Sequence, residues 1–248
     1  MDALIIAAGF GSRLRDISDS KPMTPVAGVP LLELGVRQAK AAGAARVVVV
    51  TGHEAERLEA ALPALAARTG IAVEPARVAD WAKPNGWSVI AGAERIDGDY
   101  LLMMSDHIFS APILSGLARQ GGADRGVTLA VDRRIDDPLI DPDDATWVER
   151  GPNGFIRAIG KTIASYDAVD CGAFLCTPEL AEAIRAAIAA GQPGSLSEGM
   201  QRLADAGRAA TWEIGGAWWL DVDDPRAHQL AEAQAPQRLA EVYAAALT

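Results

Sequence analysis

The chain begins with Ala3-Leu-Ile-Ile-Ala-Ala-Gly-Phe-Gly-Ser-Arg-Leu14, and Ser20-Lys-Pro22 follows shortly after. The apolar run before Gly9 predicts a short buried strand that ends at glycine. Because Gly9 and Gly11 carry no Cβ, the loop between them can turn sharply and approach a ligand closely. Converging backbone N–H groups and cationic side chains favour a phosphate or polyphosphate at such a turn. The polar side chains available there are those of Ser12, Arg13 and Lys21.

Two glycines at this spacing do not define a nucleotide site by themselves. The dinucleotide fingerprint needs a third glycine where this chain has Leu14, and the Gly-Lys-Ser/Thr of a P-loop is absent. The residues alone therefore leave open a plain strand-to-loop turn.

Composition describes an ordinary globular protein. Of its 248 residues, 50% are apolar and 23% are charged. This length is enough for one large domain or two small ones. The net charge of −10 argues against extended binding to nucleic acid or to an anionic membrane. The two cysteines, Cys171 and Cys176, lie in an apolar stretch and are expected to be buried free thiols.

Targeting signals are also missing from the pattern. An apolar strand starts directly after Met1-Asp2, so we expect no signal peptide. The longest apolar runs fall short of the roughly 18 residues that a membrane span needs. These observations predict a cytoplasmic protein without membrane insertion.

Apolar strands alternate with helical periodicity through the first half, which predicts an α/β fold with a parallel sheet covered on both faces. Ligands bind beyond the carboxyl ends of such strands, so the glycine loop and Asp106 should lie along one edge. The expected strands are 3–8, 46–51, 71–74 and 100–105, and the expected helices are 31–42, 54–67 and 87–96.

The second half has a different pattern. A polar excursion over 132–144 precedes a predicted hairpin over 147–159, with Pro152-Asn-Gly154 at its tip. No repeat or linker marks a point where the chain divides into domains. The other expected elements are strands 126–131, 170–176, 209–214 and 218–222, and helices 178–190, 197–206 and 225–247.

Acids and lysines at the predicted strand ends are candidates for chemistry. Asp106 ends an apolar strand, and Asp221 lies in Trp218-Trp-Leu-Asp-Val-Asp223; two facing carboxylates with a triphosphate would hold Mg²⁺. Most acids are solvated, and Asp223 competes with Asp221, so the residues alone leave this pairing open. The chain has only four lysines, which favours a function for Lys21 beside the glycine loop, whereas Lys161 could be a solvated hairpin end.

Asn85-Gly-Trp-Ser88 offers a donor and an acceptor for a pyrimidine edge, and Gly86 would let a base lie against the backbone. A plain Asn-Gly turn before a helix is the alternative for this segment.

Taken in order, these segments resemble inositol-1-phosphate cytidylyltransferases, within the nucleotidyltransferases that join an NTP to a phosphorylated sugar or alcohol. The resembling stretches are Ala7–Leu14 with Lys21-Pro22, Asn85–Ser88, Leu102–His107, Val131–Arg133, Ile140–Thr146, Ile159–Lys161, Tyr166–Gly172, Leu196–Glu198 and Trp219–Asp223. One departure is Trp147, where the family usually has lysine, and a changed contact at this position would alter the acceptor preference.

The resemblance implies a single-domain, GT-A/Rossmann-like nucleotidyltransferase fold over 1–248, with a mostly parallel sheet flanked by helices and a β-hairpin insertion on the acceptor side. It implies a nucleotide-binding part over about 1–125, an acceptor-binding part over about 126–223, and a closing helix over about 224–248.

The resemblance also implies roles for individual residues. Those implied to bind the nucleotide are Ala8, Gly9, Gly11, Ser12, Arg13, Asn85, Gly86, Ser88 and Asp106. Arg13 and Lys21 are the implied catalytic residues, and Asp106 and Asp221 the implied Mg²⁺ ligands. The implied acceptor-binding residues are Arg133, Lys161, Asp170 and Glu198. Asp170 and Glu198 could instead be plain hairpin or helix-cap acids.

The implied reaction joins CTP and inositol 1-phosphate, giving CDP-inositol and pyrophosphate for phosphoinositol-lipid or related polar-lipid synthesis. The attacking phosphate oxygen is already anionic, so His107 is expected to pack or hydrogen-bond beside Asp106 rather than act as a base. Alternatives are a phosphocholine cytidylyltransferase, a sugar-1-phosphate nucleotidyltransferase, or a nucleotide-sensing regulatory subunit without catalysis. A homodimer is left open.

Overall fold

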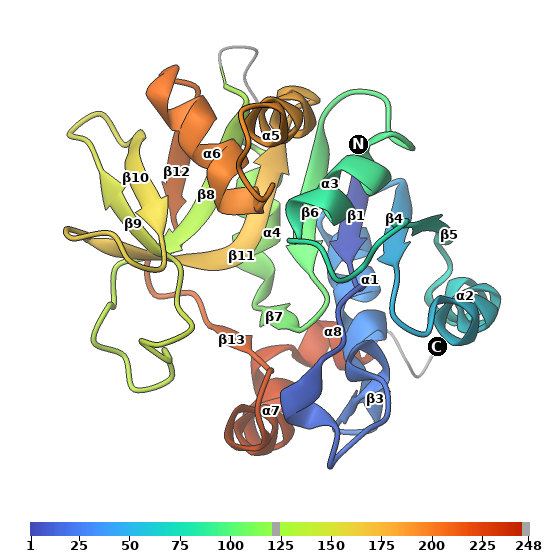
Figure 1. The fold of residues 1–248 in the computed structure, drawn as a ribbon. Coiled ribbons are helices and arrows are strands. Elements are labelled where there is room, and N and C mark those ends of the chain that lie inside the picture. The colour runs from blue at the N-terminus through green and yellow to red at the C-terminus, as the bar shows by residue number, and fades with distance from the viewer. Residues whose placement is uncertain (121–124, 245–248) are drawn as a thin grey trace.

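A parallel half-sheet forms one side of the molecule. The computed structural model describes residues 1–120 and 125–244. The strand order in this half is β6-β1-β4-β5, and neighbouring strands run parallel (Figure 1). The strands are β1 (Asp2–Ile6), β4 (Arg46–Thr51), β5 (Ala72–Arg77) and β6 (Tyr100–Met104). Each contains an apolar run that the sequence predicts as a strand.

The other half continues the same sheet with mixed directions. The long strand β11 (Ala168–Cys176) runs antiparallel to β6, and also pairs with β8 and β9. The remaining strands are β8 (Val127–Asp132), the hairpin strands β9 (Trp147–Arg150) and β10 (Ile156–Gly160), and β12 (Ala209–Glu213), which is parallel to β8. The expected hairpin is therefore present, at the outer edge of the sheet (Figure 1).

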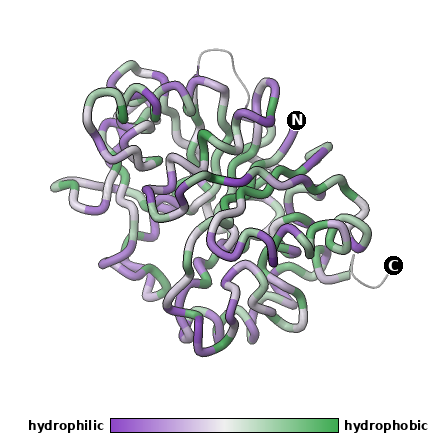
Figure 2. Tube along the Cα trace, turned by 45° about the vertical axis from the view of Figure 1, so that its right-hand side comes forward, coloured by the Kyte–Doolittle hydropathy of each residue, from purple (hydrophilic) through white to green (hydrophobic). Residues whose placement is uncertain are grey.

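Helices cover both faces because the strand side chains alternate. Along β1, Ala3 and Ile5 belong to one buried cluster, and Leu4 and Ile6 to the other. Figure 2 shows apolar residues concentrated along the central strands. The cluster with Ala3 and Ile5 includes side chains of α1 (Leu31–Ala41), α2 (Ala55–Thr69) and α4 (Ala111–Ala118). The cluster with Leu4 and Ile6 includes side chains of α3 (Gly86–Ala93), α5 (Glu179–Ala189) and α6 (Leu196–Asp205). The sequence analysis assigns no element to α4.

Short elements at the carboxyl edge of the parallel strands position the site. β7 (His107–Phe109) pairs antiparallel with β13 (Trp219–Asp221), which places Asp221 opposite His107. The segment between β1 and α1 contains two single-turn 3₁₀ helices and a small hairpin: η1 (Ser12–Leu14), η2 (Lys21–Met23), β2 (Pro25–Val26) and β3 (Val29–Pro30).

The prediction of one helix over 225–247 is wrong. The chain forms α7 (Pro225–Arg238) and α8 (Ala240–Ala244), and leaves helical backbone at Leu239, where φ is −122° and ψ is 34°. This break turns Leu239 and Val242 into a buried cluster with Leu31 of α1. Arg37 of α1 also donates to the Val242 carbonyl over 3.1 Å. Positions 245–247 of the predicted helix lie outside the described residues.

Among the helices formed by residues 1–120 and 125–244, none combines the length and apolar character needed to cross a membrane.

Candidate active site

Two cavities lie side by side at the carboxyl ends of the central strands. The smaller, of about 210 Å³, is lined by the end of β1, the following loop and the start of α3. The larger, of about 320 Å³, is lined by the second half of the chain and by the segment around β13. Asn85, Met104 and Asp106 contribute to both walls. Asp106 therefore stands at the junction of two neighbouring binding spaces.

The loop Gly9–Arg13, hereafter the signature loop, has one glycine whose conformation is essential. Gly11 has φ of +62°, and a Cβ there would lie 2.4 Å from the Cβ of Lys21. A side chain at Gly11 would thus displace Lys21 as well as strain the backbone. Gly9, Ala8 and Lys21 line the smaller cavity, whereas Ser12 begins η1 and lies outside both linings.

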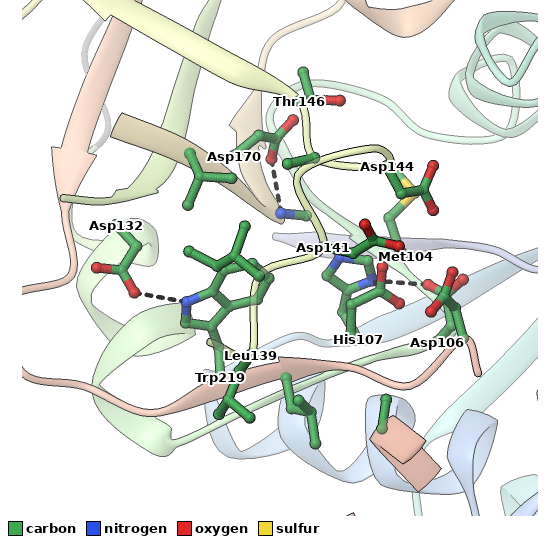
Figure 3. Close-up of a pocket in the computed structure, with 18 of the residues that line it drawn as sticks. Met104, Asp106, His107, Asp132, Leu139, Asp141, Asp144, Thr146, Asp170 and Trp219 are labelled. Carbon is green, nitrogen blue, oxygen red and sulfur yellow. Dashed lines mark hydrogen bonds and ion pairs between the residues drawn. The ribbon is translucent and has the colours of Figure 1, made fainter. Parts of the chain in front are cut away.

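A central cluster of Lys21, Asp106, His107 and Asp221 occupies the junction, and Figure 3 shows the contact between Asp106 and His107. Lys21 Nζ lies 2.5 Å from Asp106 Oδ2, and His107 Nδ1 lies 2.7 Å from Asp106 Oδ1. His107 Nδ1 is also 3.6 Å from Asp221 Oδ1. The cluster joins η2, the end of β6, β7 and β13, so it depends on contacts between residues far apart in the sequence.

Burial and charge act in opposite directions on the pKa values of the central cluster. Burial would raise the pKa of Asp106, but the charges of Lys21 and His107 hold it well below its usual range. Burial would lower the pKa of His107, but Asp221 and Asp106 raise it to about 9. Burial raises the pKa of Asp221 to about 7, with His107 opposing and Asp106 adding to the shift.

The imidazole of His107 fits into a bend of β11. Gly172 has φ of +76°, and a Cβ there would lie 2.5 Å from the His107 ring. The ring stacks on Trp219 with centroids 5.9 Å apart, and the Trp219 indole N–H donates to Asp132 Oδ2 over 2.8 Å. His107 is therefore held from three sides, as expected for a side chain that supports Asp106.

A bridging cluster of Arg13, Asp144, Asp223 and Lys161 connects the signature loop with the hairpin side. Arg13 Nη2 lies 2.6 Å from Asp144 Oδ2, and Arg13 Nη1 lies 2.5 Å from Asp223 Oδ2. Lys161 pairs with the other oxygen of Asp144. Burial would raise the pKa of Asp144, but its hydrogen bonds to Lys161 and Arg13 lower it to about 2.

The carboxylates at the junction suit a hard cation. One donor atom each from Asp106, His107 and Asp221 lie within 4.8 Å of one another, and so do oxygens of Asp144, Asp221 and Asp223. Asp221 Oδ1 is buried and has no hydrogen-bond partner among residues 1–120 and 125–244. Mg²⁺ binds through one or two carboxylates together with substrate phosphates, so Asp106 and Asp221 fit that ion.

Residues 3–203 match the MobA-like NTP transferase domain. The chain belongs to this family. A protein of Rubrobacter xylanophilus named bifunctional IPC transferase and DIPP synthase is 35% identical over 234 residues, which cover 93% of this chain and 51% of that protein. A protein of the same name from Aquifex aeolicus is 29% identical over 225 residues, 90% of this chain and 49% of that protein. The chain spans about half the length of these relatives.

Solved structures share the fold of this MobA-like transferase. The inositol-1-phosphate CTP transferase from T. maritima superposes with a TM-score of 0.82 at 21% identity, covering 95% of this chain and 96% of that one. A UDP-glucose pyrophosphorylase complexed with UDP-glucose gives a TM-score of 0.76 at 17% identity, covering 96% and 100%. The resemblance, the nucleotidyltransferase fold and the enzyme class expected from the sequence are confirmed.

The transferase places some predicted acceptor residues at the larger cavity and others away from it. Lys161 and Asp170 line this cavity, and burial raises the pKa of Asp170 to about 6. Arg133 instead extends toward Glu213, 3.5 Å away, and is outside both linings. Its neighbour Arg134, two residues beyond the end of β8, lines the larger cavity.

Glu198 lies outside both cavity linings, and its observed contacts are local. Its carboxylate accepts from the backbone N–H groups of Gly194 and Ser195, each over 2.7 Å, while the Ser195 hydroxyl accepts from the Glu198 N–H. This is a capping box at the start of α6. The alternative reading of Glu198 as a helix-cap acid therefore describes its observed contacts.

The Asn85–Ser88 segment is only partly directed at the smaller cavity. Ser88 lines the smaller cavity, and Asn85 lines both cavities while its Oδ1 accepts from the Leu196 N–H over 2.9 Å. Gly86 faces away, because a Cβ there would lie 2.3 Å from the Gly194 carbonyl oxygen. Close packing against the loop before α6, and not room for a base, explains glycine at this position.

Asp144 lies between Arg13 and Lys161, a position that the sequence does not predict for it. It follows a polar stretch with several other acids, so residue type alone could not single it out. The signal that could have found it is its place in Ile140–Thr146, one of the stretches that carry the family resemblance.

Proposed function

We propose that this transferase joins CTP and inositol 1-phosphate, releasing pyrophosphate and giving CDP-inositol, with Mg²⁺ as cofactor. The observation that carries the proposal is the junction at Asp106, where Lys21 and Asp221 meet between two cavities. The names of the relatives and of the T. maritima neighbour support the choice of CTP and inositol 1-phosphate.

The nucleotide belongs in the smaller cavity. Ala8 and Gly9 offer backbone to the base and ribose, and Asn85 and Ser88 offer polar groups. The triphosphate then extends toward Lys21 and Asp106, where positive charge is available. Arg13, on the same loop, contributes a second cation near the junction.

The acceptor belongs in the larger cavity, with its phosphate toward the junction. Lys161 supplies a cation there, and Asp170 supplies a buried carboxyl that can bond a hydroxyl group. Asp141 and Thr146 add further oxygen atoms to the same wall (Figure 3). An uncharged polyol suits this lining, because its hydroxyls both donate and accept hydrogen bonds.

The chemistry requires positioning and charge stabilisation more than proton transfer. The attacking acceptor oxygen is already anionic near pH 7, so the chain has to align it with the α-phosphate and balance the charge of the departing pyrophosphate. Lys21 and Arg13 provide fixed positive charge for that purpose. Mg²⁺ held by Asp106 and Asp221 would neutralise phosphate charge. His107 keeps Asp106 in place.

CDP-inositol is an activated donor, so we assign the reaction to the supply of inositol headgroups for polar lipids, in the cytoplasm. The homodimer stays a prediction, which light scattering on the purified chain tests.

Phosphocholine is the second candidate acceptor. Trp218 and Trp219 line the larger cavity together with several carboxylates, including Asp132 and Asp170. Aromatic faces and nearby acids attract a quaternary ammonium group. The stack of Trp219 on His107 uses part of its ring, which favours the polyol.

Pyrophosphate release tests the proposal. Each of CTP, UTP, dTTP, ATP and GTP is combined with inositol 1-phosphate, phosphocholine, glycerol 3-phosphate or glucose 1-phosphate, with and without Mg²⁺. We expect the largest kcat/KM for CTP with inositol 1-phosphate, and no turnover in EDTA. A larger value for another pair would replace the proposed substrates. CTP binding without pyrophosphate release from any acceptor would favour the nucleotide sensor.

A further inference from the structure

Two large exposed aromatic side chains lie side by side, and one of them lines the smaller cavity. Phe10 of the signature loop is 43% exposed, and Trp81, from the segment before α3, is 42% exposed. Their rings are nearly parallel, at 15°, with centroids 6.3 Å apart. His53, which follows β4, packs edge-on against both, at 4.8 and 4.9 Å. These three rings, with Arg15, form what we call the aromatic cluster.

Trp81 is the member of the cluster that lines the smaller cavity, together with the polar residues Asn85 and Ser88. The backbone is shaped to bring it there. A Cβ on Gly52 would lie 2.6 Å from the Trp81 Cβ and 2.9 Å from the Ala8 Cβ, so glycine lets Trp81 approach the end of β1. The indole thus stands beside the backbone that the proposed function assigns to base and ribose.

Arg15 fixes the other rings behind Trp81. Its guanidinium lies 4.0 Å from the Phe10 ring centre, a cation–π distance. Its Nη2 is 2.7 Å from His53 Nε2. Arginine only donates, so the Arg15 guanidinium is the donor in this contact. This hydrogen bond and the cation stacked on Phe10 reduce the freedom of the rings that hold Trp81.

We propose that the Trp81 indole is a stacking platform for the nucleobase, and that the rest of the aromatic cluster holds it in position. This inference rests on the proposed function only in placing a nucleotide in the smaller cavity. Stacking needs only the π face of a base, so Trp81 adds affinity for every nucleotide, while Asn85 and Ser88 distinguish the edges. An aromatic platform that stays partly exposed without substrate also accounts for the unusual exposure of Trp81.

Binding calorimetry on the purified chain tests the platform, with CTP, CMP and inorganic tripolyphosphate as probes. We expect Trp81→Ala to weaken CTP and CMP by about 5- to 150-fold, the range for one base stacked on one aromatic ring, and to leave tripolyphosphate unchanged. Trp81→Phe, which keeps a π face, should retain most of the affinity. Tyr166→Ala is the matched control, since Tyr166 is 41% exposed and outside both cavity linings.

Equal CTP affinity in Trp81→Ala and wild type would overturn the platform, and so would an equal loss for tripolyphosphate, which has no base. These results leave the proposed function intact if wild type still releases pyrophosphate from CTP. A wild-type chain that binds tripolyphosphate but neither CTP nor CMP would overturn both proposals together.

Discussion

Replacing Lys21 by methionine tests the charge balance at the junction most directly. The substitution keeps most of the side-chain length and removes the cation that lies 2.5 Å from Asp106 Oδ2. The Lys21 side chain is only 15% exposed, so water would compensate for little of the lost electrostatic interaction. For a phosphate charge about 4 to 5 Å away at an effective dielectric of about 20, the lost interaction is about 3 to 4 kcal/mol.

That loss corresponds to a decrease in kcat of about two to three orders of magnitude, provided that the interaction forms in the transition state. Pyrophosphate release at saturating substrates and Mg²⁺ measures it. The matched control is Lys40→Met, because Lys40 donates to the Thr69 carbonyl and lies outside both cavity linings. If Lys21→Met folded normally and kept a kcat within about threefold of wild type, the role given to Lys21 would be refuted.

Three further perturbations follow from the geometry. Asp221→Asn should raise the Mg²⁺ concentration for half-maximal activity at least about tenfold, because an amide oxygen replaces a charged ligand; an unchanged titration would exclude Asp221 as a ligand. Glu198→Gln should lower the free energy of unfolding by about 1 kcal/mol, because it weakens the capping box, and should leave the KM for acceptor unchanged. A selective rise in that KM would indicate that Glu198 contacts the acceptor. Burial raises the pKa of Tyr243 to about 12 from 10.0, and its hydroxyl donates to the Val26 carbonyl. Above pH 10 the unfolded chain ionises this phenol first, so the stability of wild type relative to Tyr243→Phe should fall between pH 10 and 12 in urea unfolding; a constant difference would contradict the shift.

The sequence predicts the central strands well because burial on both faces leaves continuous apolar runs, as in 46–51. It does not reveal α4, an eight-residue helix with Pro112 in its first turn and no polar face to mark its periodicity. The break at Leu239 follows Pro236, an interior helix proline whose effect the predicted single helix ignored, and the segment beyond the break packs against α1.

The site shows the same division. Asp106 and Asp221 lie at or just beyond strand ends, so apolar runs followed by acids indicated both as candidates, while the choice of Asp221 over Asp223 rested on the family resemblance. Beyond the end of β8 the alternation of side chains stops, and the pattern could not distinguish Arg133 from Arg134. Glu198 caps α6 because its carboxylate turns back to the backbone N–H groups at the start of the helix. The three-residue spacing of Ser195 and Glu198 permits this capping box but does not require it.

The shared wall at Asp106 has a stereochemical consequence. Since Asp106 borders both cavities, the two substrates can react directly, without a covalent intermediate on the protein. A single displacement at the α-phosphorus should then invert its configuration. A CTP analogue made chiral there with sulfur and oxygen isotopes would yield product of the opposite hand, whereas retention would reveal two successive transfers.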